Sequence, residues 1–245
     1  MIRIGTSGWV YRDWRDRFYP REVAQRRWLE HYAQWFDTVE LNATTYRLPS
    51  EAQVAAWCAK VPADFRFTVK LSRLITHRRD LPPRVDEFIA NYFARAACFE
   101  PAKIAQILIQ FPPYYRRDET RLAAFLDKLP AEYRYVVEFR DASWFEPAVR
   151  SLLAAKRIAF CIHDYPGLRV PRWITREDLA YVRFHGYTAL YAGSYPPGAL
   201  RRRAAMLREL SDEAREVYAY FNNDTAAAAP KDALALKRLL QRKRE

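Results

Sequence analysis

Short apolar runs recur along the chain, and each one ends on polar or charged residues. Parallel strands that are covered on both faces read as continuous runs of Val, Ile, Leu and Phe. On this basis we predict strands at residues 2–6, 38–41, 66–71, 107–110, 135–139, 159–162, 181–184 and 217–221. The runs therefore indicate a parallel sheet of eight strands.

Most of the segments between these runs carry apolar residues three and four positions apart, the spacing of an amphipathic helix. They predict helices at residues 26–36, 52–60, 85–97, 120–129, 144–156, 199–210 and 231–242. The stretch 166–178 holds Pro166, Gly167 and Pro171, which predicts a short irregular connection between strands six and seven. Regular alternation over 245 residues indicates an α/β protein, a single (β/α)₈ TIM-type barrel domain spanning residues 1–245.

In such barrels the functional residues follow the C-terminal ends of the strands. Polar and titratable side chains follow most of the predicted strands, and a buried charge costs several kcal/mol unless it is paired. Their convergence on one end therefore requires either a ligand or a mutual network. The candidates from the strands and their first loops are Trp9, Glu40, Asn42, Tyr46, Lys70, His77, Glu138, Arg140, Arg183, His185, Asn222, Asn223 and Asp224.

Some of these side chains are typical ligands of zinc or manganese. The possible donors are Glu40, Glu138, His163, Asp164, His185 and Asp224. Lys70, Arg140 and Arg183 lie in the same ring, where their charges neutralise the carboxylates and repel a divalent ion. A divalent metal is therefore considered but not favoured, and no cofactor is assigned.

The mixed charges also suit an acid–base site that holds an anion. Arginine donates two parallel hydrogen bonds to phosphate or carboxylate, which suits Arg140 and Arg183. Glu138 and Lys70 are the candidates for proton transfer, and Glu40 is an alternative to Glu138.

His185 and Asp224 are expected to position water or a metal. The alternative is structural: Glu40 with Lys70, and Glu138 with Arg140 or Arg183, form ion pairs that merely line the barrel.

The loops after strands seven and eight favour an anion, because barrels often bind phosphate there. The loop after strand seven supplies Tyr191, Gly193, Ser194 and Tyr195, and Asn222 and Asn223 follow strand eight. Glycine permits close backbone approach, and the hydroxyl and amide groups can donate hydrogen bonds. A tight turn and a helix cap would use the same residues. Exposed rings such as Tyr191 could stack on bases or sugars.

The formal net charge of +12 favours an anionic partner, such as nucleic acid. Solvated helix ends, including Arg201 to Arg203, explain part of the excess equally well. Met1 leads directly into the first strand and no apolar run reaches the length of a membrane span, so we expect a cytoplasmic protein with no membrane partner. The three cysteines lack the spacing of a disulfide or zinc framework. The sequence leaves the oligomeric state open.

Several ordered motifs resemble the YecE-like family, catalogued as domain of unknown function seventy-two. They are GTSGW at 5–9, ELNATTY at 40–46, KLSRLITH at 70–77, QFPP at 110–113, EFRDASW at 138–144, YVRFHG at 181–186, YAGSY at 191–195 and YFNND at 220–224. The resemblance implies a TIM-type barrel and no particular reaction, although the fold has been likened to sugar isomerase and endonuclease barrels. Two departures stand out: the run 226–229 lacks the usual glycine, and Asp232 replaces an expected asparagine.

Three functions remain open at this point. The first is an enzyme acting on a phosphate-bearing ligand, including hydrolysis of a phosphodiester in nucleic acid, with Arg140, Arg183 and Asn223 holding the anion. The second is a small-molecule sugar isomerase or lyase that uses the same groups for acid–base chemistry. The third is a non-catalytic binding or scaffold protein.

Overall fold

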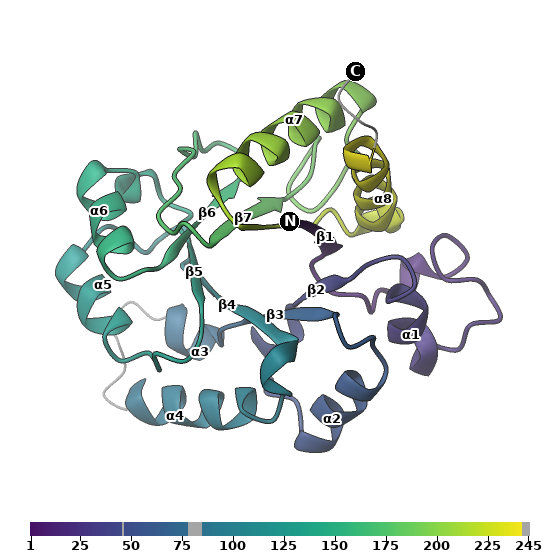
Figure 1. The fold of residues 1–245 in the computed structure, drawn as a ribbon, viewed down its shortest axis with the longest axis horizontal. Coiled ribbons are helices and arrows are strands. Elements are labelled where there is room, and N and C mark those ends of the chain that lie inside the picture. Colours follow the sequence, from purple (N-terminus) through teal and green to yellow (C-terminus); the bar gives the residue numbers. More distant parts are fainter. Residues whose placement is uncertain (46, 78–84, 242–245) are drawn as a thin grey trace.

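Eight parallel strands form a nearly closed barrel surrounded by helices (Figure 1). The computed structural model describes residues 1–45, 47–77 and 85–241. The strands are β1 Ile2–Thr6, β2 Thr38–Leu41, β3 Arg66–Lys70, β4 Ile104–Gln110, β5 Tyr135–Glu138, β6 Ala159–His163, β7 Leu179–Phe184 and β8 Glu216–Phe221. Hydrogen bonding links them in the order β1-β8-β7-β6-β5-β4-β3-β2. The α/β barrel expected from the sequence is confirmed.

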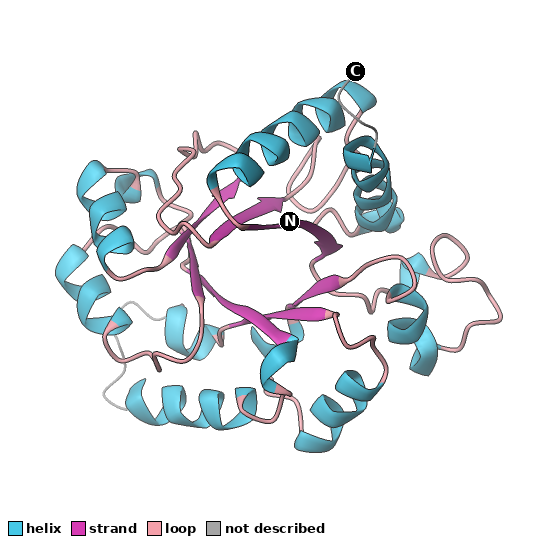
Figure 2. Cartoon of the chain, in the orientation of Figure 1, coloured by secondary structure: helices cyan, strands magenta, loops and turns pink. Residues whose placement is uncertain are grey.

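The helices lie outside the ring of strands (Figure 2). They are α1 Trp28–Tyr32, α2 Glu51–Ala59, α3 Arg73–Thr76, α4 Val85–Ala96, α5 Glu119–Leu126, α6 Pro147–Ala155, α7 Pro197–Glu213 and α8 Ala228–Gln241. The short α3 was not predicted, because four residues are too few for a periodic pattern. No helix covers the connection between β6 and β7, as the Pro- and Gly-containing stretch predicted.

The predicted helix 26–36 is shorter than expected. A 3₁₀ turn, Gln25–Arg27, precedes α1, and the residues after α1 form tighter turns, with Gln34 N donating to His31 O over 3.1 Å. Tyr32 at the end of α1 points its hydroxyl at the junction of β1 and β2, where it accepts from Thr6 N over 2.9 Å. It also donates to Thr38 O over 3.0 Å.

At this junction β1 and β2 are joined by an isolated bridge between Ser7 and Glu40, whereas the other neighbouring strands are joined by regular pairing. Gly5 makes the close approach feasible: a Cβ at this position would lie 2.3 Å from Thr38 O. The hydroxyl of Tyr32 thus completes hydrogen bonding that the two strands cannot make directly.

Tyrosine side chains fill the inside of the barrel below its C-terminal end. Tyr181, Tyr218 and Tyr220 are each buried there. The hydroxyl of Tyr220 is 2.6 Å from Thr38 Oγ1 and 2.8 Å from Thr68 Oγ1. Because this floor is packed, the polar residues above it can meet a ligand only at the C-terminal mouth.

Among the described residues, no helix is both long enough and apolar enough to cross a membrane.

Candidate functional site

Arg183, near the end of β7, lies at the centre of the mouth between two carboxylates. Nη2 donates to Glu40 Oε1 over 2.8 Å, and Nη1 donates to Glu138 Oε2. All three side chains are shielded from solvent. Glu40 also accepts from Ser7 Oγ over 2.7 Å and from Tyr181 over 2.6 Å. Both carboxylates are therefore already hydrogen-bonded inside the protein.

Arg140, just after β5, extends this ion-pair network. Its Nε donates to Glu138 Oε1 over 2.7 Å, and Nη1 donates to the hydroxyl of Tyr191 over 3.1 Å. Its guanidinium also lies over the ring of Tyr165, 4.7 Å from the centroid. Burial alone would raise the pKa of Glu138, but the charges of Arg183 and Arg140 hold it well below the usual value. Glu138 is thus a permanent anion.

Two histidines flank this network, and burial lowers the pKa of both. His163 has a pKa of about 4, and its Nε2 lies 2.9 Å from Phe139 O. His185 Nε2 lies 3.3 Å from Nη2 of Arg140 and 3.3 Å from Nη1 of Arg183, so this nitrogen is an acceptor. Its Nδ1 is buried without a hydrogen-bond partner in the described structure. His185 is therefore neutral, and its Nδ1 is the ring nitrogen without a hydrogen-bond partner among the described residues.

Lys70, at the end of β3, differs from the two arginines. Within the part of the chain that the structure describes, nothing forms a hydrogen bond or ion pair with its ammonium. Burial and the charge of Arg183 lower the pKa of Lys70 to about 8, although Glu138 and Glu40 oppose the shift. The ion pair between Glu40 and Lys70 that the structural alternative required is therefore absent from the described network. The pairs of Glu138 with Arg140 and Arg183 are present.

Asp224, after β8, is the second group with a pKa near neutrality. Burial raises the pKa of its carboxyl to about 7, and the neighbouring hydroxyl of Tyr11 and the charge of Arg183 only partly offset this. Its Oδ1 is buried and has no hydrogen-bond partner among the described residues, and the same holds for Oδ1 of Asn42. Within the described part of the mouth, Lys70 at the end of β3 is thus a cation without a partner, and the unpaired oxygens follow β2 and β8.

The loop after β7 is fastened by Asp232 of α8. Asp232 accepts from Ser194 Oγ over 2.5 Å, from Tyr195 N over 2.9 Å and from Asn223 Nδ2 over 2.8 Å. Asn223 also donates to Gly193 O over 2.9 Å. Gly193 has φ +80°, and a Cβ there would lie 2.1 Å from Thr188 Oγ1. In this structure Gly193, Ser194 and Asn223 therefore fix the shape of the loop. This is the structural role, in a tight turn and a helix cap, that the sequence left open for them.

Three other predicted site residues, Trp9, Tyr195 and Asn222, are buried. Trp9 is buried and makes an edge contact with Trp57 of α2, at 5.4 Å between ring centroids. Tyr195 is buried and donates to Asp164 over 2.7 Å. Asn222 is buried at the end of β8. These positions weigh against direct ligand contact for the three residues.

Two further predicted site residues are His77, the last described residue before 78–84, and Tyr46. His77 follows α3 and is half-buried, and burial and the charge of Lys70 lower its pKa to about 4. Tyr46 lies outside the described residues.

Sequence reasoning did not place Tyr181 or Asp232 among the site residues, although both shape the mouth. Tyr181 could have been found, because it lies two positions before Arg183 and side chains on a strand alternate between faces. Asp232 had no such signal, since it comes from a helix and meets its partners only through the fold.

Two alanines in the run 226–229, where the family resemblance led us to expect a glycine, have a left-handed backbone. Ala226 and Ala227 both have φ +57°, in the left-handed region. Ala226 N donates to Asp13 Oδ2 over 2.6 Å, which holds this turn against the loop after β1. The backbone at these two alanines thus has a conformation that suits glycine better.

The described residues offer no ready metal centre. Across 1–45, 47–77 and 85–241, no three His, Cys, Asp or Glu side chains are grouped so that they could hold an ion. The carboxylates of Glu40 and Glu138 are directed at arginine instead.

Comparison with known proteins gives one consistent family. Residues 3–245 match the family described as "Protein of unknown function DUF72". The UPF0759 protein YunF of Bacillus subtilis is 26% identical, with the match covering 98% of this chain and 95% of that protein. The UPF0759 protein YecE of Escherichia coli K12 is 33% identical over 59% of this chain and 50% of its own length.

Solved structures agree. A DUF72 family protein from Thermotoga maritima superimposes with a TM-score of 0.87 at 28% identity, covering 99% of this chain and 100% of that one. A DUF72 family protein from Enterococcus faecalis has a TM-score of 0.86 at 22% identity, covering 100% of this chain and 97% of that one, which supports the fold alone.

Proposed function

The chain belongs to the DUF72 family of proteins of unknown function, and we propose that it is an enzyme acting on a phosphate-bearing ligand held at the C-terminal mouth of its barrel. The observation that carries the proposal is the half-buried ammonium of Lys70, which has no described partner at a mouth where every other buried cation is paired. An unpaired, partly desolvated cation is stabilised by an incoming anion.

In this proposal Arg140 and Arg183 have different roles from the anion-holding role that their sequence positions suggested. Both Nη atoms of Arg183 donate to Glu40 and Glu138, and its Nε is buried, so in the proposal it holds the floor of the site in place and does not grip the ligand. Arg140 also pairs with Glu138, but it lies at the rim beside Tyr191. In the proposal, Lys70 receives the anion and Arg140 supports it from the rim.

Asp224 and Lys70 supply the acid–base chemistry. Their pKa values of about 7 and about 8 lie close to neutrality, where a side chain can both accept and release a proton. Glu138 is displaced from the proton-transfer role, since its arginine partners keep it ionised. His185 Nδ1 is available to orient a water or a ligand hydroxyl.

The same pair of groups supports a second candidate, a sugar isomerase or lyase. A base and an acid of near-neutral pKa at one mouth, here at the end of β3 and after β8, can move a proton next to a carbonyl. The two candidates differ in the ligand: phosphodiester hydrolysis needs a polymer or diester, whereas the isomerase needs a small sugar or sugar phosphate.

Calorimetric titration with inorganic phosphate, a sugar phosphate and a short oligonucleotide tests the proposal. Wild type is compared with Lys70→Met and with Lys231→Met, an exposed lysine on α8 that loses the same charge. Saturable binding that only Lys70→Met abolishes supports the anion site. Equal binding by all three proteins contradicts it, and preference for the sugar phosphate or the oligonucleotide decides between the two candidates.

A further inference from the structure

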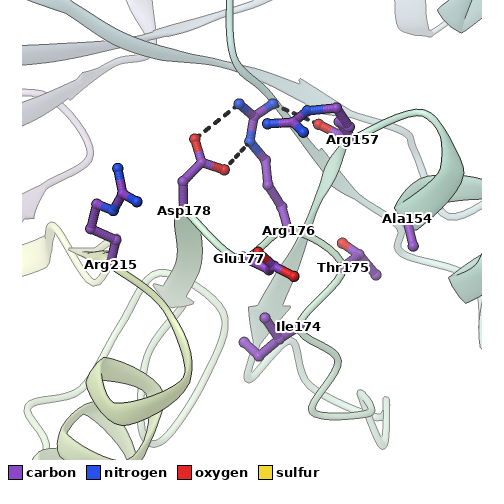
Figure 3. Close-up of a pocket in the computed structure, with 8 residues that line it drawn as sticks. All are labelled: Ala154, Arg157, Ile174, Thr175, Arg176, Glu177, Asp178 and Arg215. Atoms are coloured by element: carbon purple, nitrogen blue, oxygen red, sulfur yellow. Dashed lines mark hydrogen bonds and ion pairs between the residues drawn. The ribbon is translucent and has the colours of Figure 1, made fainter.

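A cavity of about 550 Å³ lies at the N-terminal ends of β6, β7 and β8, between the end of α6, residues 174–178 and Arg215 (Figure 3). Arg176 donates there to both carboxylate oxygens of Asp178, over 2.5 and 3.0 Å. Across the described residues, none of the side chains that line this cavity has a buried polar atom without a hydrogen-bond partner. The mouth at the other end of the barrel differs, because Oδ1 of Asp224 is such an atom.

The hydroxyl of Tyr11, in the loop after β1, has two acceptors beside it. It donates to Ser7 O, and it adjoins the carboxyl of Asp224, whose ionised form it stabilises. A phenolic hydroxyl carries one proton, and in this structure Ser7 O accepts it. Oδ1 of Asp224 is therefore left without a partner among the described residues.

The ring of Tyr11 is held close to Asp224. Gly8 leaves room for it, because a Cβ at this position would lie 3.0 Å from the Tyr11 hydroxyl. The ring centroid of Tyr11 lies 4.8 Å from that of Trp14, which is buried and donates through Nε1 to Asp224 O over 2.8 Å. The loop after β1 thus fixes the backbone of Asp224 through Trp14 and places the Tyr11 hydroxyl at its carboxyl.

Burial has the largest effect on the carboxyl of Asp224 and favours its neutral form, as do the charges of Glu40 and Asp13. The hydroxyl of Tyr11 and the charge of Arg183 favour the ionised form. Arg183 is fixed by its ion pairs, whereas a hydroxyl can turn about its C–O bond. Burial, followed by the charge of Asp224, also raises the pKa of Tyr11 well above its usual value, so the hydroxyl keeps its own proton.

We propose that Tyr11 is a positioning residue for Asp224, whose hydroxyl donates to Ser7 O while the carboxyl is neutral and turns to the carboxylate when Asp224 releases its proton. The released proton passes to the ligand or to water, and Tyr11 keeps its own. An acid that gains a hydrogen bond on ionisation releases its proton more readily. The inference rests on the acid–base role proposed for Asp224, and it adds the residue that sets the proton affinity of that carboxyl.

The pKa of Asp224, measured by NMR on protein with ¹³C-labelled aspartate, tests the inference. Tyr11→Phe removes the hydroxyl and should raise this pKa from about 7 by about 1 or more, as the loss of a hydrogen bond to a charged group predicts. Tyr19→Phe is a matched control. Tyr19 belongs to the same ring cluster, 6.1 Å from Trp14, but its hydroxyl donates to Trp9 O over 2.6 Å. The control should leave the pKa of Asp224 unchanged.

An unchanged pKa in Tyr11→Phe, or an equal rise in both variants, overturns the inference. A second measurement needs no change at Tyr11: the ¹³C signal of its Cζ, which bears the hydroxyl, should shift with pH through the same midpoint as Asp224. The shift should disappear in Asp224→Asn, and a Tyr11 signal that stays constant in wild type also overturns the inference. Neither measurement uses a ligand, so the phosphate titration of Lys70→Met tests the function of the mouth separately.

Discussion

Arg183 Nη2 donates to Glu40 Oε1 over 2.8 Å, and neither side chain is exposed to solvent. Burial alone would lower the pKa of Arg183, but Glu138 and Glu40 raise it well above its usual value. Arg183 therefore stays cationic, and it acts together with the two carboxylates as one structural unit.

Removal of this arginine should be strongly destabilising. Arg183→Met leaves two carboxylates buried without their cation, and breaking a buried pair costs about 3–5 kcal/mol. Urea denaturation at pH 7 measures the loss directly. Adding Glu40→Gln and Glu138→Gln to Arg183→Met should recover most of it. A single variant within about 1 kcal/mol of wild type would contradict a fully desolvated network.

Lys70→Met should stabilise the protein in a pH-dependent way. The pKa of Lys70 falls to about 8 in the native state from 10.5, so the unfolded chain binds more protons between these values. Wild-type stability therefore rises with pH across this window. We expect the advantage of Lys70→Met to be full below pH 8 and to disappear towards pH 10.5. An advantage independent of pH would mean that the ammonium is not desolvated.

Asp224→Asn should show the complementary profile. Burial raises the pKa of Asp224 to about 7 from 3.8, so the native state binds more protons between these values and loses stability as the pH rises through them. The asparagine variant should match wild type near pH 4 and exceed it at pH 8. Thermal unfolding across this range gives the comparison, and parallel curves would remove Asp224 as a near-neutral acid.

Ala226→Gly should raise stability, because Ala226 has φ +57° and glycine adopts this conformation without steric strain. The expected gain is about 1 kcal/mol, measured by urea denaturation. Ala56→Gly, at an exposed position in the middle of α2, is a matched control, which should instead lose stability. A loss in Ala226→Gly would show that the turn tolerates alanine at no cost.

The barrel could be predicted because its strands are buried on both faces, so that each strand is a run of apolar residues in the sequence. Even the missing helix between β6 and β7 followed from Pro166, Gly167 and Pro171. The short α3 and the shortened α1 could not be predicted, because one is below the length of a helical period and the other ends where Tyr32 must reach the β1–β2 junction.

The site was predicted less completely, for a physical reason. Sequence position places Lys70, Arg140 and Arg183 alike at strand ends. Only the three-dimensional pairing separates Lys70, which has no partner among the described residues, from the two arginines that are paired with carboxylates. In the same way, Ser194 and Asn223 have the chemistry of anion ligands, yet Asp232 from another element holds both. Burial and pairing, which no local pattern encodes, decide which charge is left for a ligand.

The most direct test of this account is the pKa of Lys70, measured by NMR on protein with ¹³C-labelled lysine, with and without inorganic phosphate. The account predicts a pKa of about 8 for the free protein. It also predicts an upward shift on adding phosphate, since an anion favours the charged ammonium. A pKa near 10.5 that phosphate leaves unchanged would contradict the claim that Lys70 is the free cation of the site.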